Sequence, residues 1–210
     1  DPGPYRPRAL RLMGALSAKV VALVCRGSEE DRAIAVALAE AGADLALGTV
    51  SVAQVEEFST ASIANEVWAI GREQFNSVLD ASDPAAAAAF AAEVCDRLGR
   101  CDAVVIAPGP APRIQVDELS RDEWDSIVAG GLTAPLVAAI AFSQVIERGG
   151  GGAIAVVIDG APHGDVAGAM MAEGLRAMAA NMGIAWGGRK LRAIVLSRDG
   201  APEHVVSALG

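Results

Sequence analysis

The stretch VVALVC (20–25), RGSEED (26–31) and AIAVALAEAGADLAL (33–47) determines the fold of this 210-residue chain. Its first six residues form a short, continuously apolar run, which is typical of a strand buried on both faces. RGSEED is polar and predicts a turn, and the Ala-rich residues 32–41 that follow predict a helix. Because a second apolar run lies at 45–47, the stretch is predicted to form a strand, a turn, a helix and another strand.

The same alternation continues along the chain. Apolar runs at 75–79, 103–106, 154–158 and 191–196 predict further strands, and helical patterns lie at 62–70, 84–98, 121–146 and 166–186. Strands that alternate with helices form parallel sheets with helices on both faces. We therefore predict an α/β fold with a doubly wound, Rossmann-like parallel sheet in three αβα layers, forming one domain over 13–210. Residues 1–12, with three prolines and three arginines, predict a flexible basic extension.

Composition narrows the class of protein. The chain is 52% hydrophobic, which excludes general disorder. A formal net charge of −9 disfavours nucleic acids and anionic membranes as partners. The three cysteines lack metal-ligand spacing and no secretory signal precedes them, so we expect free thiols, no metal and a cytoplasmic location. The longest apolar segment, 127–146, contains Gly130, Gly131 and Pro135, which favours a buried helix over a membrane span.

A doubly wound sheet binds its ligands beyond the carboxyl ends of its strands, near the point where the strand order reverses. The segments that follow the predicted strands are therefore the places to look for chemistry. These segments are 25–32, 48–51, 80–83, 107–112, 159–165 and 197–200.

Three stretches resemble the short-chain dehydrogenase/reductase superfamily in helix length, strand position and spacing. They are AIAVALAEAGADLAL (33–47), LDASDPAAAAAFAAEVCDRLGRCDAVVIAPG (79–109) and LSRDEWDSIVAGGLTAP (119–135). The resemblance covers the chain from residue 19 to about 200. It implies a nucleotide-binding scaffold, on which members of the superfamily perform oxidoreduction with NAD or NADP. The superfamily's substrate-covering segment and last strand have no counterpart after residue 200, so either both have been lost or this sequence omits segments of a longer chain.

The cofactor motifs implied by the resemblance are degenerate. The superfamily places T-G-x-x-x-G-x-G after the first strand, where this chain has CRGSEEDR (25–32) and keeps only Gly27 as a glycine. Residues 29–31 are three acids, which repel a pyrophosphate and instead predict a helix cap. Residues 48–50 (GTV) and 106–109 (IAPG) likewise lack the expected polar groups. We therefore predict no bound nucleotide cofactor. Gly27 and Asp80 remain weak candidates, and Asp80 also fits a helix start.

The catalytic residues of the superfamily are replaced as well. Its Asn, Ser and Tyr-x-x-x-Lys pair fall on Gly131, Asp159, Gly168 and Ala172. In the superfamily, the lysine lowers the pKa of the tyrosine so that it exchanges a proton with the substrate. Here the one tyrosine is Tyr5 and the two lysines are Lys19 and Lys190, so no alignment shift builds the pair.

Residues 166–186 form the least charged predicted helix. They contain only two charged residues, Glu173 and Arg176, and four of the five methionines. A helix that is apolar nearly all round must be covered on several sides, and one sheet covers a single face. The resemblance implies that this helix and 121–146 form a dimer interface. The residues that we predict there are Leu132, Val137, Ile140, Met170, Met171, Leu175, Met178, Met182 and Trp186.

Three functions remain open. The first is a non-catalytic, pseudoenzyme subunit that pairs as a dimer or tetramer, with itself or with an active dehydrogenase/reductase that it supports. The second is an atypical NAD(P)-dependent oxidoreductase that uses Asp159 and His163 for proton transfer. The third is a sensor whose altered crevice binds another small molecule.

Overall fold

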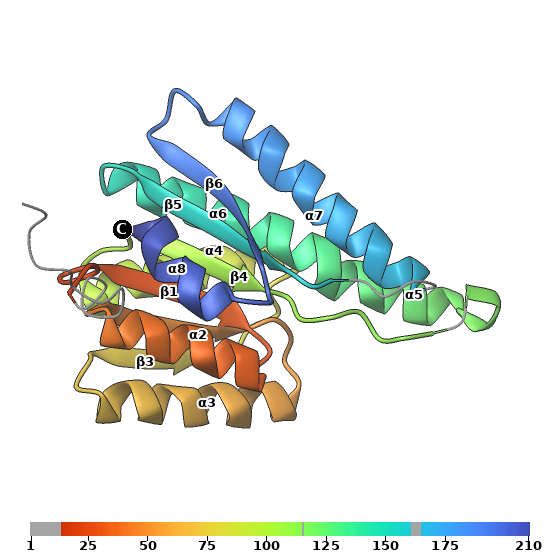
Figure 1. Ribbon diagram of the computed structural model, residues 1–210, viewed down its shortest axis with the longest axis horizontal. Helices are drawn as coiled ribbons and strands as arrows, with labels where there is room; N and C mark the ends of the chain where they lie inside the picture. The colour runs from red at the N-terminus through yellow and green to blue at the C-terminus, as the bar shows by residue number, and fades with distance from the viewer. Residues whose placement is uncertain (1–13, 115, 161–164) are drawn as a thin grey trace, which may run out of the picture.

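Six parallel strands form one sheet, in the order β3-β2-β1-β4-β5-β6, in the computed structural model, which describes residues 14–114, 116–160 and 165–210 (Figure 1). This order confirms the predicted doubly wound, Rossmann-like fold. The order reverses between β1 and β4, where a crevice opens at the carboxyl ends of the strands. The strands are β1 (Val20–Cys25), β2 (Asp44–Thr49), β3 (Gln74–Ser77), β4 (Ala103–Ala107), β5 (Gly152–Ile158) and β6 (Leu191–Ser197).

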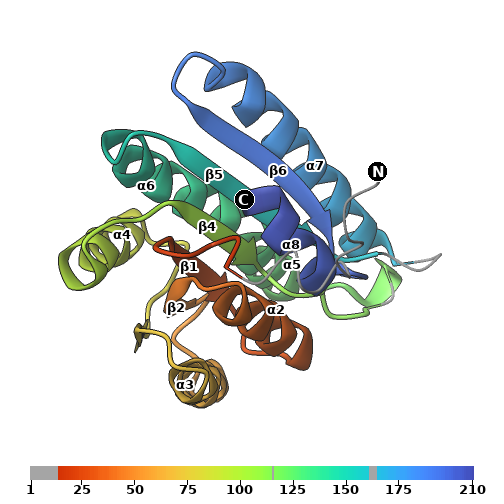
Figure 2. The same ribbon diagram turned by 60° about the vertical axis from the view of Figure 1, so that its left-hand side comes forward.

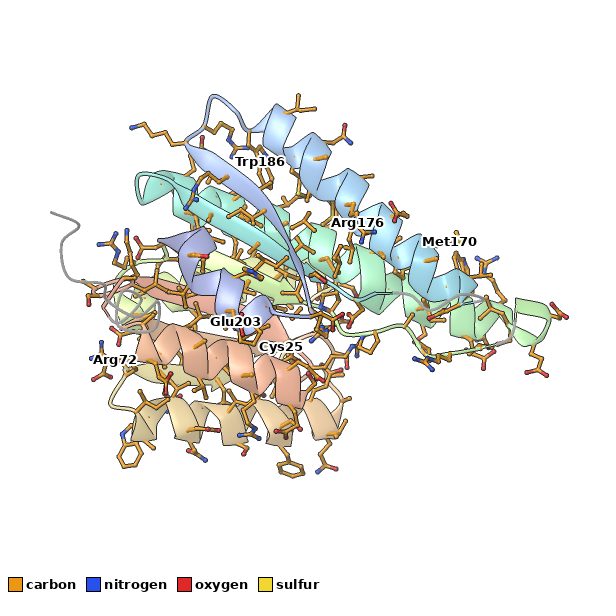
Figure 3. All side chains as sticks on the ribbon, in the orientation of Figure 1. Cys25, Arg72, Met170, Arg176, Trp186 and Glu203 are labelled. Carbon is orange, nitrogen blue, oxygen red and sulfur yellow. The ribbon has the colours of Figure 1, made fainter. Side chains whose placement is uncertain are left out.

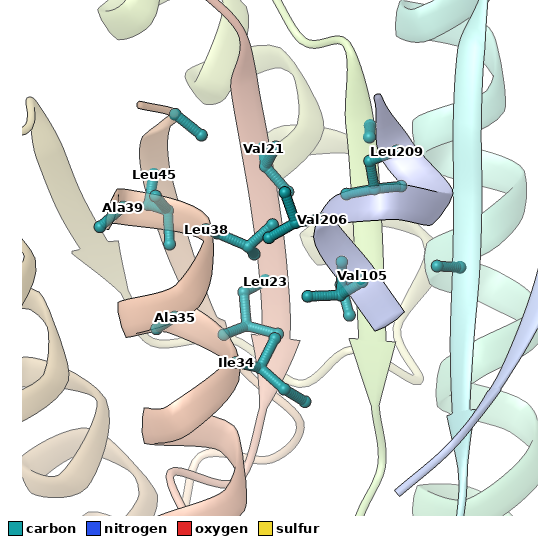
Figure 4. Close-up of a cluster of buried hydrophobic side chains, with 14 of the residues drawn as sticks. Val21, Leu23, Ile34, Ala35, Leu38, Ala39, Leu45, Val105, Val206 and Leu209 are labelled. Carbon is teal, nitrogen blue, oxygen red and sulfur yellow. The ribbon is translucent and has the colours of Figure 1, made fainter. Parts of the chain in front are cut away.

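Helices cover both faces of the sheet (Figure 2). One face carries α2 (Glu29–Glu40), α3 (Gln54–Ala69) and α8 (Ala201–Leu209), and the other carries α4 (Pro84–Leu98), α6 (Ala134–Arg148) and α7 (Val166–Ala185). Successive residues of β1 point to opposite faces, so Leu23 packs in the first core and Val24 in the second. Figure 4 shows the first core, which contains Leu23 of β1, Ile34 of α2 and Val206 of α8.

The second core contains most of the buried aromatic rings. The ring of Phe90 lies edge-on to the rings of Phe75 and Phe142, with centroids 6.1 and 5.7 Å apart. Phe142 and Ile146 are fully buried on α6. The helical stretch Arg121–Arg148 is long and apolar enough to cross a membrane by length and composition. Its second part, α6, packs against β4 and β5 and is a core helix, as the sequence predicted.

Two helices differ clearly from their predicted bounds. Helix α3 begins at Gln54 rather than at 62. The prediction missed its first turn because this turn is polar and carries a buried carboxylate, Glu56. The predicted helix 121–146 is divided into α5 (Arg121–Val128), a π-helical segment (Ala129–Thr133) and α6. The division falls on Gly130 and Gly131, since glycine weakens a regular helix. The expected flexible extension, 1–12, lies outside the described residues.

The C-terminal residues form a helix that the sequence did not predict. Val205 and Val206 of α8 are buried against α2 and the first face of the sheet. Gly200 precedes α8 with a left-handed φ of 84°, a conformation that glycine adopts without strain. Residues 197–200 therefore connect β6 directly to a helix that completes the first core.

Asp102 joins β1 to β4 at the amino edge of the sheet. Its carboxylate accepts hydrogen bonds from the Val20 amide (3.0 Å), from Lys19 and from Arg100. Burial opposes the charge, but these donors outweigh it and the pKa of Asp102 is lowered. A lowered carboxyl pKa adds stability above the unfolded-state pKa of about 3.9, and this stability is lost as the pH falls through the folded-state pKa.

We therefore expect Asp102→Asn to lower the free energy of unfolding by about 1–3 kcal/mol at pH 7. The difference between the variant and the wild type should shrink as the pH falls below about 4, the pKa of this carboxyl in the unfolded chain, and should go on shrinking down to the lower folded-state pKa. Urea unfolding followed by circular dichroism at pH 7 and at pH 3 measures both effects. A difference that stays constant across this range would show that the Asp102 charge contributes nothing.

Candidate functional site

A cavity of about 600 Å³ opens beyond the carboxyl ends of β1, β4 and β5. Its walls are largely apolar and come from the loop after β4, from α5 and from α7, where Met171 and Leu175 line it. Four charged side chains also reach the lining: Arg26, Glu123, Asp159 and Asp165. Asp165 caps α7 by accepting a hydrogen bond from the Gly168 amide (2.8 Å), and Glu123 caps α5 with Ser120. Two of the charged groups therefore serve helix ends.

The structure brings together the four positions where the resemblance expects catalytic residues, because Gly131, Asp159, Gly168 and Ala172 all line this cavity. Three of them carry no functional side chain. The two lysines lie at the amino edge of the sheet, since Lys19 directly precedes β1 and Lys190 directly precedes β6. The described residues therefore place no phenol and no amine in the cavity. Tyr5 and His163 lie outside the described part of the chain.

The N-terminus of α2 is the place where a doubly wound fold holds a pyrophosphate. Here Asp31 occupies it: one carboxylate oxygen accepts hydrogen bonds from the Gly27 amide (3.1 Å) and the Ser28 amide (3.0 Å). The Ser28 hydroxyl in turn accepts a hydrogen bond from the Asp31 amide, which completes a capping box. The prediction that the acids cap this helix is confirmed. Gly27 is required by packing, because a Cβ there would collide with Ser59 of α3.

Arg198 follows β6 and pairs with two carboxylates from distant parts of the chain. Its Nη1 donates to the second oxygen of Asp31 (3.0 Å) and its Nε donates to Asp159. The side chain of Asp31 is fully buried, and that of Arg198 is 9% exposed. Burial alone would lower the pKa of Arg198, but Asp31 and Asp159 outweigh it and the pKa is raised. Within the described residues, Nη2 of Arg198 is buried and has no hydrogen-bond partner.

A second arginine side chain crosses the crevice from the other side. Arg26, directly after β1, donates to the Pro108 carbonyl beyond β4 and to Glu56 of α3. Glu56 is 4% exposed and accepts the Val50 amide (3.0 Å) and the Ser51 amide (2.8 Å), just after β2. The Arg26 side chain lies against Gly109 and Gly130, where a Cβ would collide with it or crowd it. These glycines make room for the guanidinium.

These contacts do not fit a dinucleotide such as NAD or NADP. The amides that would hold its pyrophosphate are bonded to Asp31, and those after β2 are bonded to Glu56. The weak candidate Asp80 accepts hydrogen bonds from the Ser82 amide and hydroxyl, while Asp83 caps α4. Asp80 therefore serves the turn that begins α4.

The sequence reasoning missed Arg26, Glu56 and Arg198. It interpreted the segments that contain the two arginines as a turn and a helix cap, and it gave Glu56 no role. One signal was present, because Arg26 and Arg198 each directly follow the carboxyl end of a strand. A positive charge at that edge of a parallel sheet requires an anion, whether from a ligand or from the chain itself.

Among the described residues, the cysteine thiols and the acidic side chains form no further reactive centre besides this cavity. Cys25 ends β1 beside the crevice, but burial raises the pKa of its thiol and Asp31 raises it further. Burial likewise raises the pKa of Cys101. These thiols are therefore protonated and unsuited to nucleophilic attack. Among the residues that the structure describes, no group of three His, Cys, Asp or Glu side chains is arranged to hold a metal ion.

The outer face of α7 differs from the predicted partner surface. Met171, Leu175, Met182 and Trp186 are buried in the chain's own core, because the sheet and the π-helical segment cover more of α7 than one face. Leu132, Val137 and Met178 are partly buried. Ile140 and Met170 are exposed, as are three apolar residues that we did not predict: Leu136, Val166 and Ile184. Figure 3 shows Met170 and Arg176 along α7.

Two curated relatives from mycobacteria are similar to this chain. An uncharacterized oxidoreductase of Mycobacterium tuberculosis is 26% identical over 143 residues, which are 68% of this chain and 52% of that protein. The probable oxidoreductase EphD of Mycobacterium bovis is 30% identical over 150 residues, 71% of this chain and 24% of that protein. The chain thus spans about half the length of the first relative and about a quarter of the second.

Solved structures support the fold. A short-chain type dehydrogenase/reductase from Mycobacterium marinum superposes with a TM-score of 0.80 at 18% identity, over 90% of this chain and 77% of that one. Residues 32–200 match the protein family described as enoyl-(acyl carrier protein) reductase. This match covers most of the chain, including the five strands β2 to β6. The chain therefore belongs to this family, within the short-chain dehydrogenase/reductase superfamily.

Proposed function

We propose that this chain is a non-catalytic subunit built on the short-chain dehydrogenase/reductase fold, which pairs with itself or with an active relative. The observation that carries the proposal is the position of Asp31, whose carboxylate is bonded to the Gly27 and Ser28 amides. These two amides form the cradle that would hold a phosphate of a dinucleotide, and with Asp31 bonded to them the cradle has no room for that phosphate. The replacement of the catalytic positions by Gly131, Gly168 and Ala172 supports the same proposal.

The exposed apolar residues of α6 and α7 support the pairing. Leu136 and Ile140 are 41% and 47% exposed, and Met170 and Ile184 are 50% and 81% exposed. The two charged residues of α7 neutralise each other, because Arg176 forms an ion pair with Glu173. These two helices thus present apolar side chains with little net charge, which is what the core of a protein interface requires.

We expect the isolated wild-type chain, or its complex from native cells, to have the mass of two or more subunits. Replacing Ile140 and Ile184 together by Glu should weaken the association by about 100-fold, because the interface would bury two charges. Native mass spectrometry and analytical ultracentrifugation measure the change, and circular dichroism checks the fold. The matched control is Val55→Glu on α3, where Val55 is 70% exposed outside the proposed surface. A wild-type monomer that associates with no dehydrogenase would contradict the proposal.

The cavity favours a second candidate function, the binding of a small molecule as a sensor. Its volume of about 600 Å³ lies within the range of ordinary ligand pockets, about 300–1,000 Å³. Its walls are largely apolar, so the ligand would be a small molecule with an apolar body. A metabolite that raises the thermal midpoint of the wild type would support this candidate. Ala172→Trp, which fills the cavity, should abolish the effect.

An oxidoreductase that uses Asp159 and His163 has weaker support. Asp159 accepts a hydrogen bond from the buried Arg198, so its carboxylate is already engaged in an ion pair within the chain. A substrate would have to compete with this contact. The nucleotide titration described in the Discussion separates this alternative from the proposed non-catalytic subunit.

A further inference from the structure

Two arginine side chains cross the crevice of this chain in opposite directions. Arg26 reaches from the half of the sheet that contains β1 to the Pro108 carbonyl beyond β4. Arg198 reaches from β6, in the other half, to Asp31 on α2. A dinucleotide bound to a doubly wound sheet lies across this same reversal of strand order. The chain therefore joins its two halves at the place where a bound cofactor would lie.

We propose that Asp31 is a resident anion, whose carboxylate takes the place of a phosphate group on the amide cradle of α2, with Arg198 as its counter-ion. One oxygen of Asp31 meets two backbone N–H groups, as a phosphate oxygen does at a helix N-terminus. The other oxygen meets a guanidinium. Asp31 belongs to the same turn of α2 as the cradle, so an external anion must compete with an attached one. The wild-type crevice is therefore closed to phosphate groups.

The orphaned nitrogen of Arg198 is an independent sign of a larger anion site. The Arg198 side chain is about nine-tenths buried, and within the described residues its Nη2 atom has no acceptor. Buried guanidinium nitrogens are normally hydrogen-bonded. A carboxylate offers two oxygens, and a tetrahedral phosphate offers more. One unused donor beside the cradle is the result expected when a carboxylate replaces a larger anion.

This inference deepens the proposed function, because it states how the fold dispenses with a nucleotide, but it does not depend on any partner. It predicts that removing the Asp31 carboxylate opens a site for a free anion. The site would consist of the Gly27 and Ser28 amides and the Arg198 guanidinium. The adjacent acids Glu29 and Glu30 are exposed and solvated, so they weaken this site but do not fill it.

The experiment measures the thermal midpoint of Asp31→Ala against the concentration of inorganic phosphate at constant ionic strength. The variant should melt below the wild type without phosphate. Its midpoint should rise by about 3–8 °C between zero and 50 mM phosphate, as expected for millimolar affinity in a chain of this size. The same phosphate range should move the wild-type midpoint by no more than the small stabilisation that phosphate gives most proteins.

Two further variants identify the site. Asp31→Asn keeps a side chain on the cradle and should respond to phosphate as little as the wild type does. Asp31→Ala combined with Arg198→Met lacks the guanidinium and should lose the phosphate response. The proposal is overturned if the midpoint of Asp31→Ala responds no more than that of the wild type, whether or not the variant folds without phosphate. It is equally overturned if the double variant keeps the full response. Neither result depends on oligomeric state, so failure here is distinguishable from failure of the proposed pairing.

Discussion

Arg198→Met is expected to lower the free energy of unfolding by about 3–5 kcal/mol, because it leaves two carboxylates without their buried counter-ion. Asp31 is fully buried and Asp159 is 22% exposed, so water solvates the remaining charges poorly. Arg198→Lys should give a smaller loss, since an ammonium group is a point charge and does not reproduce the planar guanidinium that spans two partners. Urea unfolding at pH 7, followed by circular dichroism, measures both values.

The chain contains a matched control for this prediction. Arg189 likewise donates hydrogen bonds through two of its nitrogens, in this case to a single carboxylate, that of Glu147. The side chains of Arg189 and Glu147 are 36% and 39% exposed. Arg189→Met should therefore lower the free energy of unfolding by only about 0–1 kcal/mol. Equal losses for the Arg198 and Arg189 variants would show that burial of the Asp31–Arg198–Asp159 cluster does not add to its strength.

The second large effect concerns nucleotides. We expect the wild-type chain to bind NADH and NADPH with dissociation constants above about 1 mM, which corresponds to a binding free energy weaker than about 4 kcal/mol. The cradle amides are already bonded to Asp31, and each exposed acid beside them repels a phosphate by about 1 kcal/mol at a few ångströms. Fluorescence or calorimetric titration measures the constant, with an active family member as the positive control.

A micromolar dissociation constant would contradict this expectation. It would show that Asp31 moves aside when a dinucleotide arrives, and it would revive the oxidoreductase that uses Asp159 and His163. In that case Asp31→Asn should tighten the binding further, because it removes a negative charge from the path of the phosphates. Tighter binding by this variant would show that the Asp31 carboxylate competes with the phosphates. Unchanged binding would show that the dinucleotide is held elsewhere on the chain.

Local pattern predicted most of the scaffold. Each of the six predicted apolar runs overlaps a strand. The central strands β1, β4 and β5 are buried on both faces and so need no alternation of polar residues, whereas the edge strands β3 and β6 are partly exposed. The pattern failed where polar residues are buried or helices are short. The first turns of α3 look like a loop, since the role of Glu56 is to accept amides from a different segment. The nine-residue α8 gains its stability from packing on α2 rather than from its own sequence.

The predicted partner surface also shows that a local sequence pattern does not predict which side chains are buried. Composition identified 166–186 as unusually apolar, but the sequence did not show which of its sides the chain itself covers. Met171 and Met170 are neighbours with similar chemistry, and yet one is 6% exposed and the other 50% exposed. The difference arises because Met171 packs on Gly131 of the π-helical segment, a contact between residues 40 positions apart.

The amino-acid sequence by itself determined that no Tyr-x-x-x-Lys pair exists, because the number of tyrosines and lysines is independent of how the chain folds. It also determined the alternation of strands and helices from β1 to β6, since apolar periodicity is a local property. Only the tertiary structure decided what the acids after β1 do. Asp31 and Arg198 are 167 residues apart, and they meet because the strands run parallel, so that the carboxyl ends of β1 and β6 lie at the same edge of the sheet. An ion pair of this kind depends on how distant parts of the chain are brought together, which no local pattern of residues determines.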